Sequence, residues 1–378
     1  MEYQRQLPPQ YQSQPQQGLL FRLHLDAPLL AALLVLTALG LLVLYSAADQ
    51  GMAMMTRQGV RLAVGFGLLA VLAQIPPRTY RFWSPAAYGA GLALLVLVLV
   101  LGARAQGAQR WLNVFGVFHF QPTEIMKVAV PAMVAWYFST RSLPARGRDI
   151  VVVLVLILTP SALIAMQPDL GSSLLIAASG LIVLFLAGLS WRLISATLVL
   201  VLIAAPLMYF FVLHDYQRQR VDTFLNPQSD RLGAGWNIIQ SQTAIGSGGL
   251  TGKGWLNGTQ SRLDFLPEST TDFILAVLGE EQGLLGVTVL IALYLVILGR
   301  CFWISAHAQD TYSRLLAGAF TVTFFIYIFV NMGMASGLLP VVGIPLPLIS
   351  YGGSSLVTLL AAFGMLMSIH THRKLLGT

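Results

Sequence analysis

In the stretch LPESTTDFILAVLGEEQGLLG, residues 266–286, three carboxylates lie where a membrane helix is expected to begin: Asp272, Glu280 and Glu281. Asp272 ends a polar run, whereas the two glutamates lie within the apolar run that follows. A carboxylate inside a membrane span is costly, so it faces a cavity or a charged partner. On a helix, Glu280 would lie about 12 Å deeper than Asp272 and about 80° around the axis, and Glu281 about 180° around. Only Glu280 could therefore share a cavity with Asp272, and a structural role, such as pairing with a buried cation, is favoured for both glutamates.

Two interpretations of Asp272 are compatible. The sequence S-T-T-D, from Ser269 to Asp272, fits a helix capping box, and local physics favours that role. A carboxylate at the rim of a low-dielectric cavity would instead have a raised pKa, which suits a general base. A cap also holds a side chain still, so one residue can serve both purposes.

Other charged residues mark further candidate positions. In QPTEIMK, Glu124 and Lys127 are spaced i, i+3 and share a helix face, where they form either a functional pair or a satisfied structural pair. Arg110, in an aromatic-rich outer loop, suits a phosphate or a lipid headgroup equally. Asp169 in QPDLGSS fits a tight turn better than a site.

A long polar segment carries more cations. Arg218 and Arg220 lie in the basic stretch HDYQRQR, and Lys253 lies in the glycine-rich stretch AIGSGGLTGKGW. The glycine-rich stretch lacks the spacing of a phosphate-binding P-loop, although its backbone N–H groups could still face an anion. The stretch PLPLISYGGSS, with its prolines and glycines, predicts a cavity-lining loop at membrane depth.

Composition places these residues in a membrane protein. Of the 378 residues, 56% are hydrophobic and 10% are charged, against about 25% charged in soluble domains. Apolar runs predict an all-α polytopic protein with about ten membrane helices, because a span needs about 20 apolar residues. The expected helices are 28–47, 58–75, 84–102, 123–139, 150–166, 171–189, 193–213, 272–299, 314–335 and 352–370.

Lysine and arginine set the expected orientation. Placing both termini in the cytoplasm puts twelve of these residues in inner segments and five in short outer loops and helix ends, as the positive-inside rule requires. Residues 214–271 then form a long outer loop between helices seven and eight. Residues 1–18, rich in Gln and Pro, are expected to be a disordered tail before one membrane domain at 19–378. The net charge of +7 is spread over many loops, so no nucleic-acid partner is expected.

Together, five motifs resemble the SEDS (shape, elongation, division and sporulation) family of peptidoglycan glycosyltransferases. They are QPTEIMK, QPDLGSS, HDYQRQR, the long stretch GWNIIQSQTAIGSGGLTGKGWLNGTQSRLDFLPESTTDFILAVLGEE, and PLPLISYGGSS. The resemblance spans nearly the whole chain and implies polymerisation of lipid II at the outer face of the bacterial inner membrane. It also implies a class B penicillin-binding protein as partner, within a set of elongation-complex membrane proteins. The family's essential acid corresponds to Asp272.

The implied reaction needs one base and some positive charge. A sugar hydroxyl attacks C1 of another sugar, and pyrophosphate leaves without a proton, so paired acids of the glycosidase type are unnecessary. Asp272 is the expected base. Five cations are expected to hold the phosphates: Arg110, Lys127, Arg218, Arg220 and Lys253. Glu124 and Asp169 are expected to be further substrate-binding residues. Alternatively, Asp272 binds a divalent cation, Mg²⁺ or Mn²⁺; no organic cofactor is expected.

Two rival functions make different demands on the sequence. A lipid II flippase would need paired charges along a path to the cytoplasmic face, whereas the acids here gather at the outer end. A non-catalytic scaffold for a transpeptidase would tolerate replacement of Asp272. Surface catalysis is favoured over both.

Overall fold

The structure is a computed structural model. It describes residues 23–105, 108–114, 118–189, 215–226, 234–262 and 268–372, together with scattered positions between 195 and 211 and positions 228, 265 and 266.

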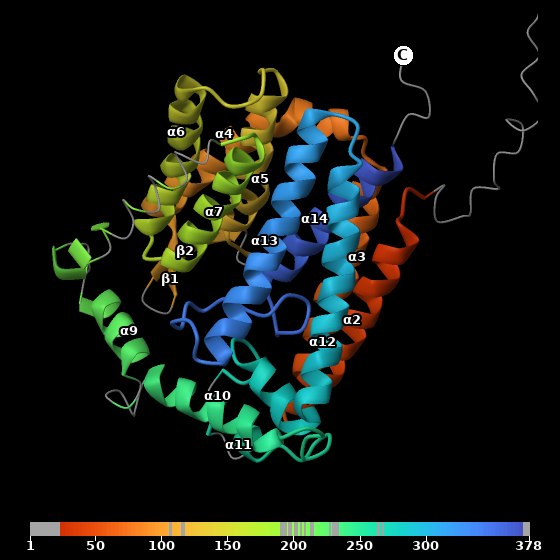
Figure 1. Cartoon of the computed structure of the whole chain (residues 1–378), viewed down its shortest axis with the longest axis vertical. Helices are drawn as coiled ribbons and strands as arrows, with labels where there is room; N and C mark the ends of the chain where they lie inside the picture. The colour runs from red at the N-terminus through yellow and green to blue at the C-terminus, as the bar shows by residue number, and fades with distance from the viewer. Residues whose placement is uncertain are drawn as a thin grey trace, which may run out of the picture.

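Long apolar helices form a bundle whose axes run roughly vertically in Figure 1. Seven described helices are long and apolar enough to cross a membrane: α2 (Ala27–Ala47), α3 (Met52–Gln74), α4 (Pro77–Leu101), α6 (Gly147–Ala165), α12 (Ile274–Ala306), α13 (Thr311–Ala335) and α14 (Ser354–Thr371). Helices α5 (Pro122–Ser139) and α7 (Leu170–Leu186) complete the described part of the bundle. The all-α membrane architecture is confirmed.

Nine of the ten predicted helices correspond to helices in the described ranges. The structure describes only scattered positions of the remaining predicted helix, 193–213, and none of the tail at 1–18, so both stay predictions. Helix α3 starts six residues earlier than expected and α4 seven, because their first turns carry polar residues that an apolar run does not include. Helix α12 continues beyond the expected end, since Arg300 finds a buried partner.

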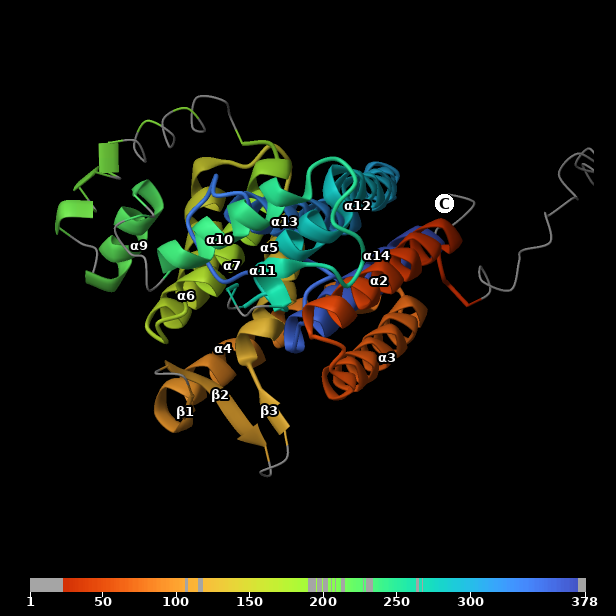
Figure 2. The same cartoon turned by 90° about the horizontal axis from the view of Figure 1, so that it is seen from below.

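Two parts of the outer segments differ from the expected loops. Residues after α4 form a small antiparallel sheet in the order β1 (Ala103–Ala105), β2 (Ala108–Val114) and β3 (Phe118–Phe120), which Figure 2 shows beside α4. The predicted long loop at 214–271 contains α9 (Asp215–Leu225), α10 (Ala234–Gly248) and α11 (Thr259–Arg262). Helix α10 packs against α12 at the lower end of the bundle in Figure 1.

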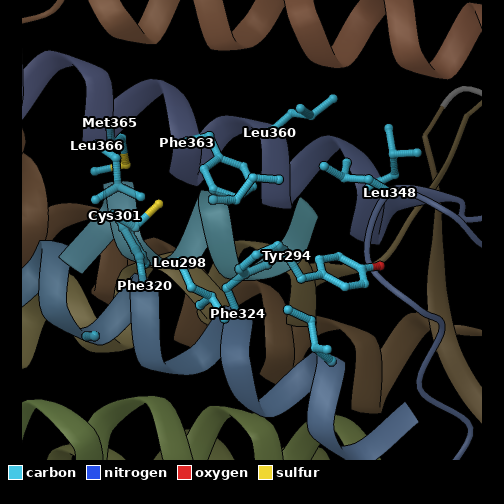
Figure 3. Packing of buried hydrophobic residues seen from close by; sticks show 14 of the residues in the cluster. Tyr294, Leu298, Cys301, Phe320, Phe324, Leu348, Leu360, Phe363, Met365 and Leu366 are labelled. Carbon is cyan, nitrogen blue, oxygen red and sulfur yellow. The ribbon is translucent and has the colours of Figure 1, made fainter. Parts of the chain in front are cut away.

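An aromatic core joins the last three membrane helices. The rings of Tyr294 in α12 and Phe324 in α13 are 5.9 Å apart, and those of Phe324 and Phe363 in α14 are 5.1 Å apart. Figure 3 shows these rings within the buried cluster. The Tyr294 hydroxyl donates a 2.7 Å hydrogen bond to the carbonyl of Pro347, so the core also holds the non-helical stretch that follows α13.

A buried ion pair ties the start of α2 to α12 and α14. Asp26 caps α2 by accepting from the Leu29 N–H, and Arg300 donates to both of its carboxylate oxygens at 3.0 and 2.6 Å. The His370 Nε2 lies 3.6 Å from the same carboxylate, and the guanidinium lies 4.3 Å from the Trp303 ring. Burial alone would raise the pKa of Asp26, but the hydrogen bonds from Arg300 and the Leu29 N–H, together with the charge of Arg300, outweigh it and lower the pKa.

Replacing Arg300 with alanine should destabilise the fold by about 2 kcal/mol, because the Asp26 side chain is only 3% exposed and loses its main charged partner. The measurement is thermal unfolding of the purified protein in detergent. Since the pKa of Asp26 is lowered in the folded state, this contribution should be full at neutral pH and disappear as the pH falls through that pKa.

Arg141→Ala is the matched control for Arg300→Ala. Arg141 is 53% exposed and lies 3.9 Å from Asp149, so its removal should cost less than about 0.5 kcal/mol. Equal losses from the two variants would contradict the assigned role of Arg300.

Candidate active site

Asp272 lies in a non-helical turn directly before α12. The helix begins at Ile274, its N-cap is Phe273, and no side chain caps it. The predicted capping box at Ser269 and Asp272 is therefore wrong. The turn is instead closed by the N–H groups of Thr271 and Phe273, which both donate to the carbonyl of Glu268.

A second non-helical stretch, residues 340–353, holds this turn in place. The N–H of Tyr351 donates to the Thr270 carbonyl at 2.8 Å, and the Ser350 hydroxyl donates to the Thr271 carbonyl. The same hydroxyl accepts from the N–H of Leu346 at 2.8 Å. These bonds satisfy backbone groups that membrane lipid could not.

Asn331 in α13 links the two stretches a second time. Its side-chain amide donates to the carbonyl of Asp272 at 2.9 Å and to that of Ile344 at 2.7 Å. The backbone of Asp272 is thus fixed from α13, and the direction of its side chain follows from it.

The carboxylate of Asp272 makes no hydrogen bond or ion pair with the described residues, although it is half-buried. Burial, helped by the negative charge of Glu268, raises the pKa of Asp272 to about 6. A carboxylate with this pKa is ionised at neutral pH and still basic enough to accept a proton from a hydroxyl during a reaction.

A polar cavity of about 230 Å³ adjoins Asp272. Its walls include Lys127, Asp169, Ser172, Tyr327 and Gly343. A Cβ atom built on Gly343 would lie 3.6 Å from the Oδ2 atom of Asp272, so the carboxylate borders the cavity wall. The structure therefore brings three of the predicted residues, Lys127, Asp169 and Asp272, to one site.

A smaller apolar cavity, of about 60 Å³, adjoins the polar one. The two share Lys127, Tyr327, Pro345 and Ser355, and the apolar part is lined by residues that include Phe320, Phe324, Leu356 and Leu359. The predicted cavity-lining role of PLPLISYGGSS is confirmed, because residues 345–348 line this wall. A polar space that passes directly into an apolar one suits an amphiphilic molecule with a charged head and a hydrocarbon tail.

The predicted pair in α5 forms as expected. The Lys127 ammonium lies 2.8 Å from Oε1 of Glu124, and it faces the Tyr327 ring at 6.0 Å from the centroid. Both members are largely buried, and Lys127 also reaches the wall of the polar cavity. Glu124 thus positions the Lys127 ammonium at the cavity wall, where it could bind an anionic ligand.

Asp169 directly follows the turn between α6 and α7 and is the N-cap of α7. Its carboxylate accepts from the Ser172 N–H and from the Gln121 side chain, both at 3.2 Å. The residue lines the polar cavity as well, so the turn and site interpretations hold together.

Glu280 accepts hydrogen bonds from the glycine-rich segment rather than facing Asp272's cavity. Lys253 donates to it at 2.6 Å, Thr259 through its N–H and hydroxyl at 2.8 and 2.7 Å, and Gln260 through its N–H at 3.1 Å. Lys253 is 30% exposed and Glu280 is 0% exposed. The cation that was expected to hold phosphate therefore has a buried structural partner, and its phosphate role stays a prediction.

The glycine-rich segment also packs closely against α12, with glycines at the points of closest approach. A Cβ atom on Gly248 would lie 1.9 Å from the Gly279 carbonyl oxygen, and one on Gly252 would lie 2.1 Å from that of Glu281. Glu281 itself accepts from the Ser46 hydroxyl of α2. These two glutamates have the structural role that the sequence favours.

The structure does not place the three predicted phosphate-binding arginines, Arg110, Arg218 and Arg220, at the polar cavity. Arg218 donates to the carbonyls of Tyr209 and Phe210 at 2.9 and 2.8 Å, so its guanidinium is engaged with backbone. Arg110 lies on β2 and Arg220 on α9, and the side chains of both fall outside the described part of the structure. Phosphate contacts by these three arginines stay predictions.

Sequence reasoning missed several residues that build the site. Asn331, Ser350 and Tyr327 were not singled out, although a lone amide within an apolar helix is a signal of buried hydrogen bonding. Arg61, one of the five cations expected in the outer loops and helix ends, donates to the Gly352 carbonyl at 3.2 Å and lies 4.5 Å from the Tyr351 ring centroid. It therefore supports the turn that carries Ser350.

Among the described residues, no three His, Cys, Asp or Glu side chains form a group that could hold a metal ion. One unpartnered carboxylate does fit Mg²⁺ or Mn²⁺ held jointly with substrate phosphates, since Mg²⁺ commonly takes one or two carboxylates, phosphate oxygens and water.

Comparisons with known proteins show similarity over nearly the whole chain. A model of the FtsW/RodA/SpoVE family, described as "Cell cycle protein", matches residues 21–375. Peptidoglycan glycosyltransferase MrdB of Escherichia coli K12 is 54% identical over 356 residues, which cover 94% of this chain and 96% of that protein. A probable peptidoglycan glycosyltransferase FtsW of Geobacter sulfurreducens is 39% identical over 370 residues, covering 92% and 96%.

Solved structures share the fold. A chain from the work "Structural coordination of polymerization and crosslinking by a peptidoglycan synthase complex" superposes with a TM-score of 0.81 at 34% identity, covering 91% of this chain and 97% of that one. The rod shape determining protein RodA of Thermus thermophilus gives 0.70 at 31% identity, covering 92% and 98%.

Removing the buried acceptor that organises the glycine-rich segment should destabilise the fold. Glu280→Ala leaves the donors of Lys253, Thr259 and Gln260 without their shared partner, and we expect a loss of about 3 kcal/mol. Thermal unfolding in detergent would measure it, together with protease cleavage within residues 249–258, which should become faster.

Lys253→Ala separates the two roles of that lysine. A structural lysine gives a loss of stability of about 1 kcal/mol, smaller than that of Glu280→Ala because Lys253 is partly exposed. A phosphate-binding lysine would instead raise the KM for a lipid-linked substrate at unchanged stability, which would contradict the structural assignment.

Proposed function

The chain belongs to the FtsW/RodA/SpoVE family of cell cycle proteins, and from that membership we propose that it is a peptidoglycan glycosyltransferase of the rod-shape type. In this proposal it polymerises lipid II into glycan strands for cell elongation. The observation that carries the proposal is the unpartnered carboxylate of Asp272, with a raised pKa, beside a polar cavity that continues into an apolar one.

The proposed reaction balances with one base. The 4-hydroxyl oxygen of the acceptor sugar forms a bond to C1 of the donor sugar, and its proton passes to the carboxylate of Asp272. The bond from C1 to the pyrophosphate oxygen breaks, and the undecaprenyl pyrophosphate leaves with the electron pair. Because this leaving group is already an anion, a second acid to protonate it is unnecessary.

Lys127 is the best-supported cation for the leaving phosphates. It lines the polar cavity whose wall at Gly343 lies next to the Asp272 carboxylate, and its carboxylate partner is Glu124. Arg218 and Lys253 have partners of their own, as described above, and would have to exchange them. A fixed ammonium at the developing negative charge stabilises the transition state without reorganisation.

A divalent cation remains part of the proposal in an alternative form. Asp272 would hold Mg²⁺ or Mn²⁺ between its carboxylate and the substrate phosphates, and the ion would supply positive charge to the leaving group. Asp272 would then be a ligand rather than the base.

The proposed location and partners follow from the family. We propose that the chain spans the bacterial inner membrane with Asp272 at the periplasmic face. Its proposed partners are a class B penicillin-binding protein, which crosslinks the new strands, and other membrane proteins of the elongation complex. The similarity to a chain studied in a peptidoglycan synthase complex supports a transpeptidase partner.

Replacing Asp272 with asparagine should abolish polymerisation. The change preserves size while removing the base, and we expect the rate to fall by about 10²- to 10⁴-fold. The assay follows glycan polymer made from labelled lipid II by the purified protein and its transpeptidase partner in lipid. Asp49→Asn, at an exposed outer turn, is the matched control and should keep full activity.

Two outcomes would overturn the proposal. Undiminished polymer from a folded Asp272→Asn variant would remove Asp272 from the chemistry. Transfer of lipid II across the bilayer by the native protein, without any polymer, would favour the flippase alternative.

The pH dependence of the rate tests whether Asp272 acts as the base. The rate should be low below about pH 6, where the carboxyl is protonated, and should rise as the pH passes through its pKa. Glu268→Gln removes the neighbouring negative charge and should shift this inflection to lower pH. An inflection that stays in place, or moves upward, would contradict an assignment of the inflection to Asp272.

A further inference from the structure

A second polar cavity lies at the end of the bundle opposite Asp272. It measures about 300 Å³, and its lining includes Arg78, Arg81, Gln309, Asp310, Tyr312 and His372. Helix α13 runs from Tyr312 beside this cavity to Asn331 beside Asp272, as Figure 1 shows from the upper to the lower end. Nineteen residues of helix span about 28 Å, close to the thickness of the hydrocarbon core. The two cavities therefore lie at opposite membrane interfaces.

The second cavity offers positive charge. Arg78 and Arg81 lie in the first turns of α4, and both are exposed, with no ion pair to the described residues. The N-terminal ends of α4 and α13 meet at this cavity, and such ends carry partial positive charge. Asp310 is the one acid among the lining residues named, and its oxygens are occupied in capping α13 through the N–H and hydroxyl of Ser313 at 2.9 and 2.7 Å.

Exposed aromatic side chains flank the arginines. Phe82 is 75% exposed and Trp83 is 58% exposed, directly after Arg81. Their rings meet edge to face with centroids 5.6 Å apart. Aromatic side chains gather at the level of lipid headgroups, so this exposed pair places the mouth of the cavity at that level.

The cavity is preformed by contacts between distant segments. The hydroxyls of Ser84 in α4 and Tyr312 in α13 are 2.9 Å apart, which joins the starts of the two helices. At the end of α14, the His372 ring stacks on that of His24 at 3.9 Å. A ligand would thus find its walls in place without refolding of the chain.

We propose that this cavity binds the phosphate of an anionic phospholipid headgroup from the adjoining leaflet. Arg78 and Arg81 would donate to the phosphate oxygens, for which a guanidinium has a matching geometry. The acyl chains would lie along the outer surface of α4, next to Phe82 and Trp83. A phospholipid fits better than free phosphate, because free phosphate would gain nothing from the exposed aromatic pair.

Native mass spectrometry of the detergent-purified protein tests the proposal. The protein is incubated with phosphatidylglycerol or with phosphatidylcholine, and retained lipid is counted as the collision energy rises. We expect selective retention of phosphatidylglycerol, with at least about tenfold weaker binding in Arg78→Gln/Arg81→Gln. Arg78→Lys/Arg81→Lys keeps the charge and should keep most of the binding.

Arg141→Gln/Arg148→Gln is the matched control, since it removes two exposed arginines outside the cavity, one shortly after α5 and one in the first turn of α6. Its retention of phosphatidylglycerol should change less than about threefold. Equal loss in the control, or no loss in the Arg78/Arg81 glutamine variant, would overturn the proposal. Stabilisation of the lipid-free protein by inorganic phosphate alone, dependent on the same arginines, would overturn the choice of a lipid. None of these measurements uses the catalytic activity, so the outcome is independent of the proposed function.

Discussion

The structure depends on satisfying backbone groups where the chain leaves helical geometry at membrane depth. Lipid provides no hydrogen bonds, so a non-helical segment there needs partners from the protein. Ser350 and Asn331 supply them, because each bonds to the turn before α12 and to the stretch after α13. The position of Asp272 is therefore determined by side chains that lie far from it in sequence. The cavity beside it exists because these hydrogen bonds keep the two stretches in a non-helical conformation.

The carboxylates of Asp272, Glu280 and Glu281 have different roles because they meet different numbers of hydrogen-bond donors. Glu280 is surrounded by N–H, hydroxyl and ammonium groups, and Glu281 is reached by a hydroxyl from α2. Asp272 meets none from the described residues and keeps a raised pKa of about 6. Saturated acids stabilise the fold, whereas the unsaturated acid is free to exchange a proton. Residue type and depth alone could not separate these roles.

The features that sequence could predict are those with local causes. Apolar runs located nine helices, and the i, i+3 spacing gave the pair of Glu124 and Lys127. The capping box failed because the carbonyls of Thr270 and Thr271 accept bonds from Tyr351 and Ser350, which hold the turn outside the helix. These hydrogen bonds join residues about eighty positions apart in the sequence, so no local sequence pattern predicts them.

The number of free acids bears on the kind of chemistry that the site supports. Hydrolysis of an ordinary glycosidic bond takes two carboxyl groups, one of which protonates the leaving oxygen. Among the described residues, Asp169 is the acid that lines the polar cavity itself, and it is already engaged with Ser172 and Gln121. One unpartnered acid beside a lysine therefore suits a substrate whose leaving group needs charge rather than a proton. A sugar on a lipid pyrophosphate has that property, and the junction of a polar with an apolar cavity at Lys127 and Tyr327 matches its division into head and tail.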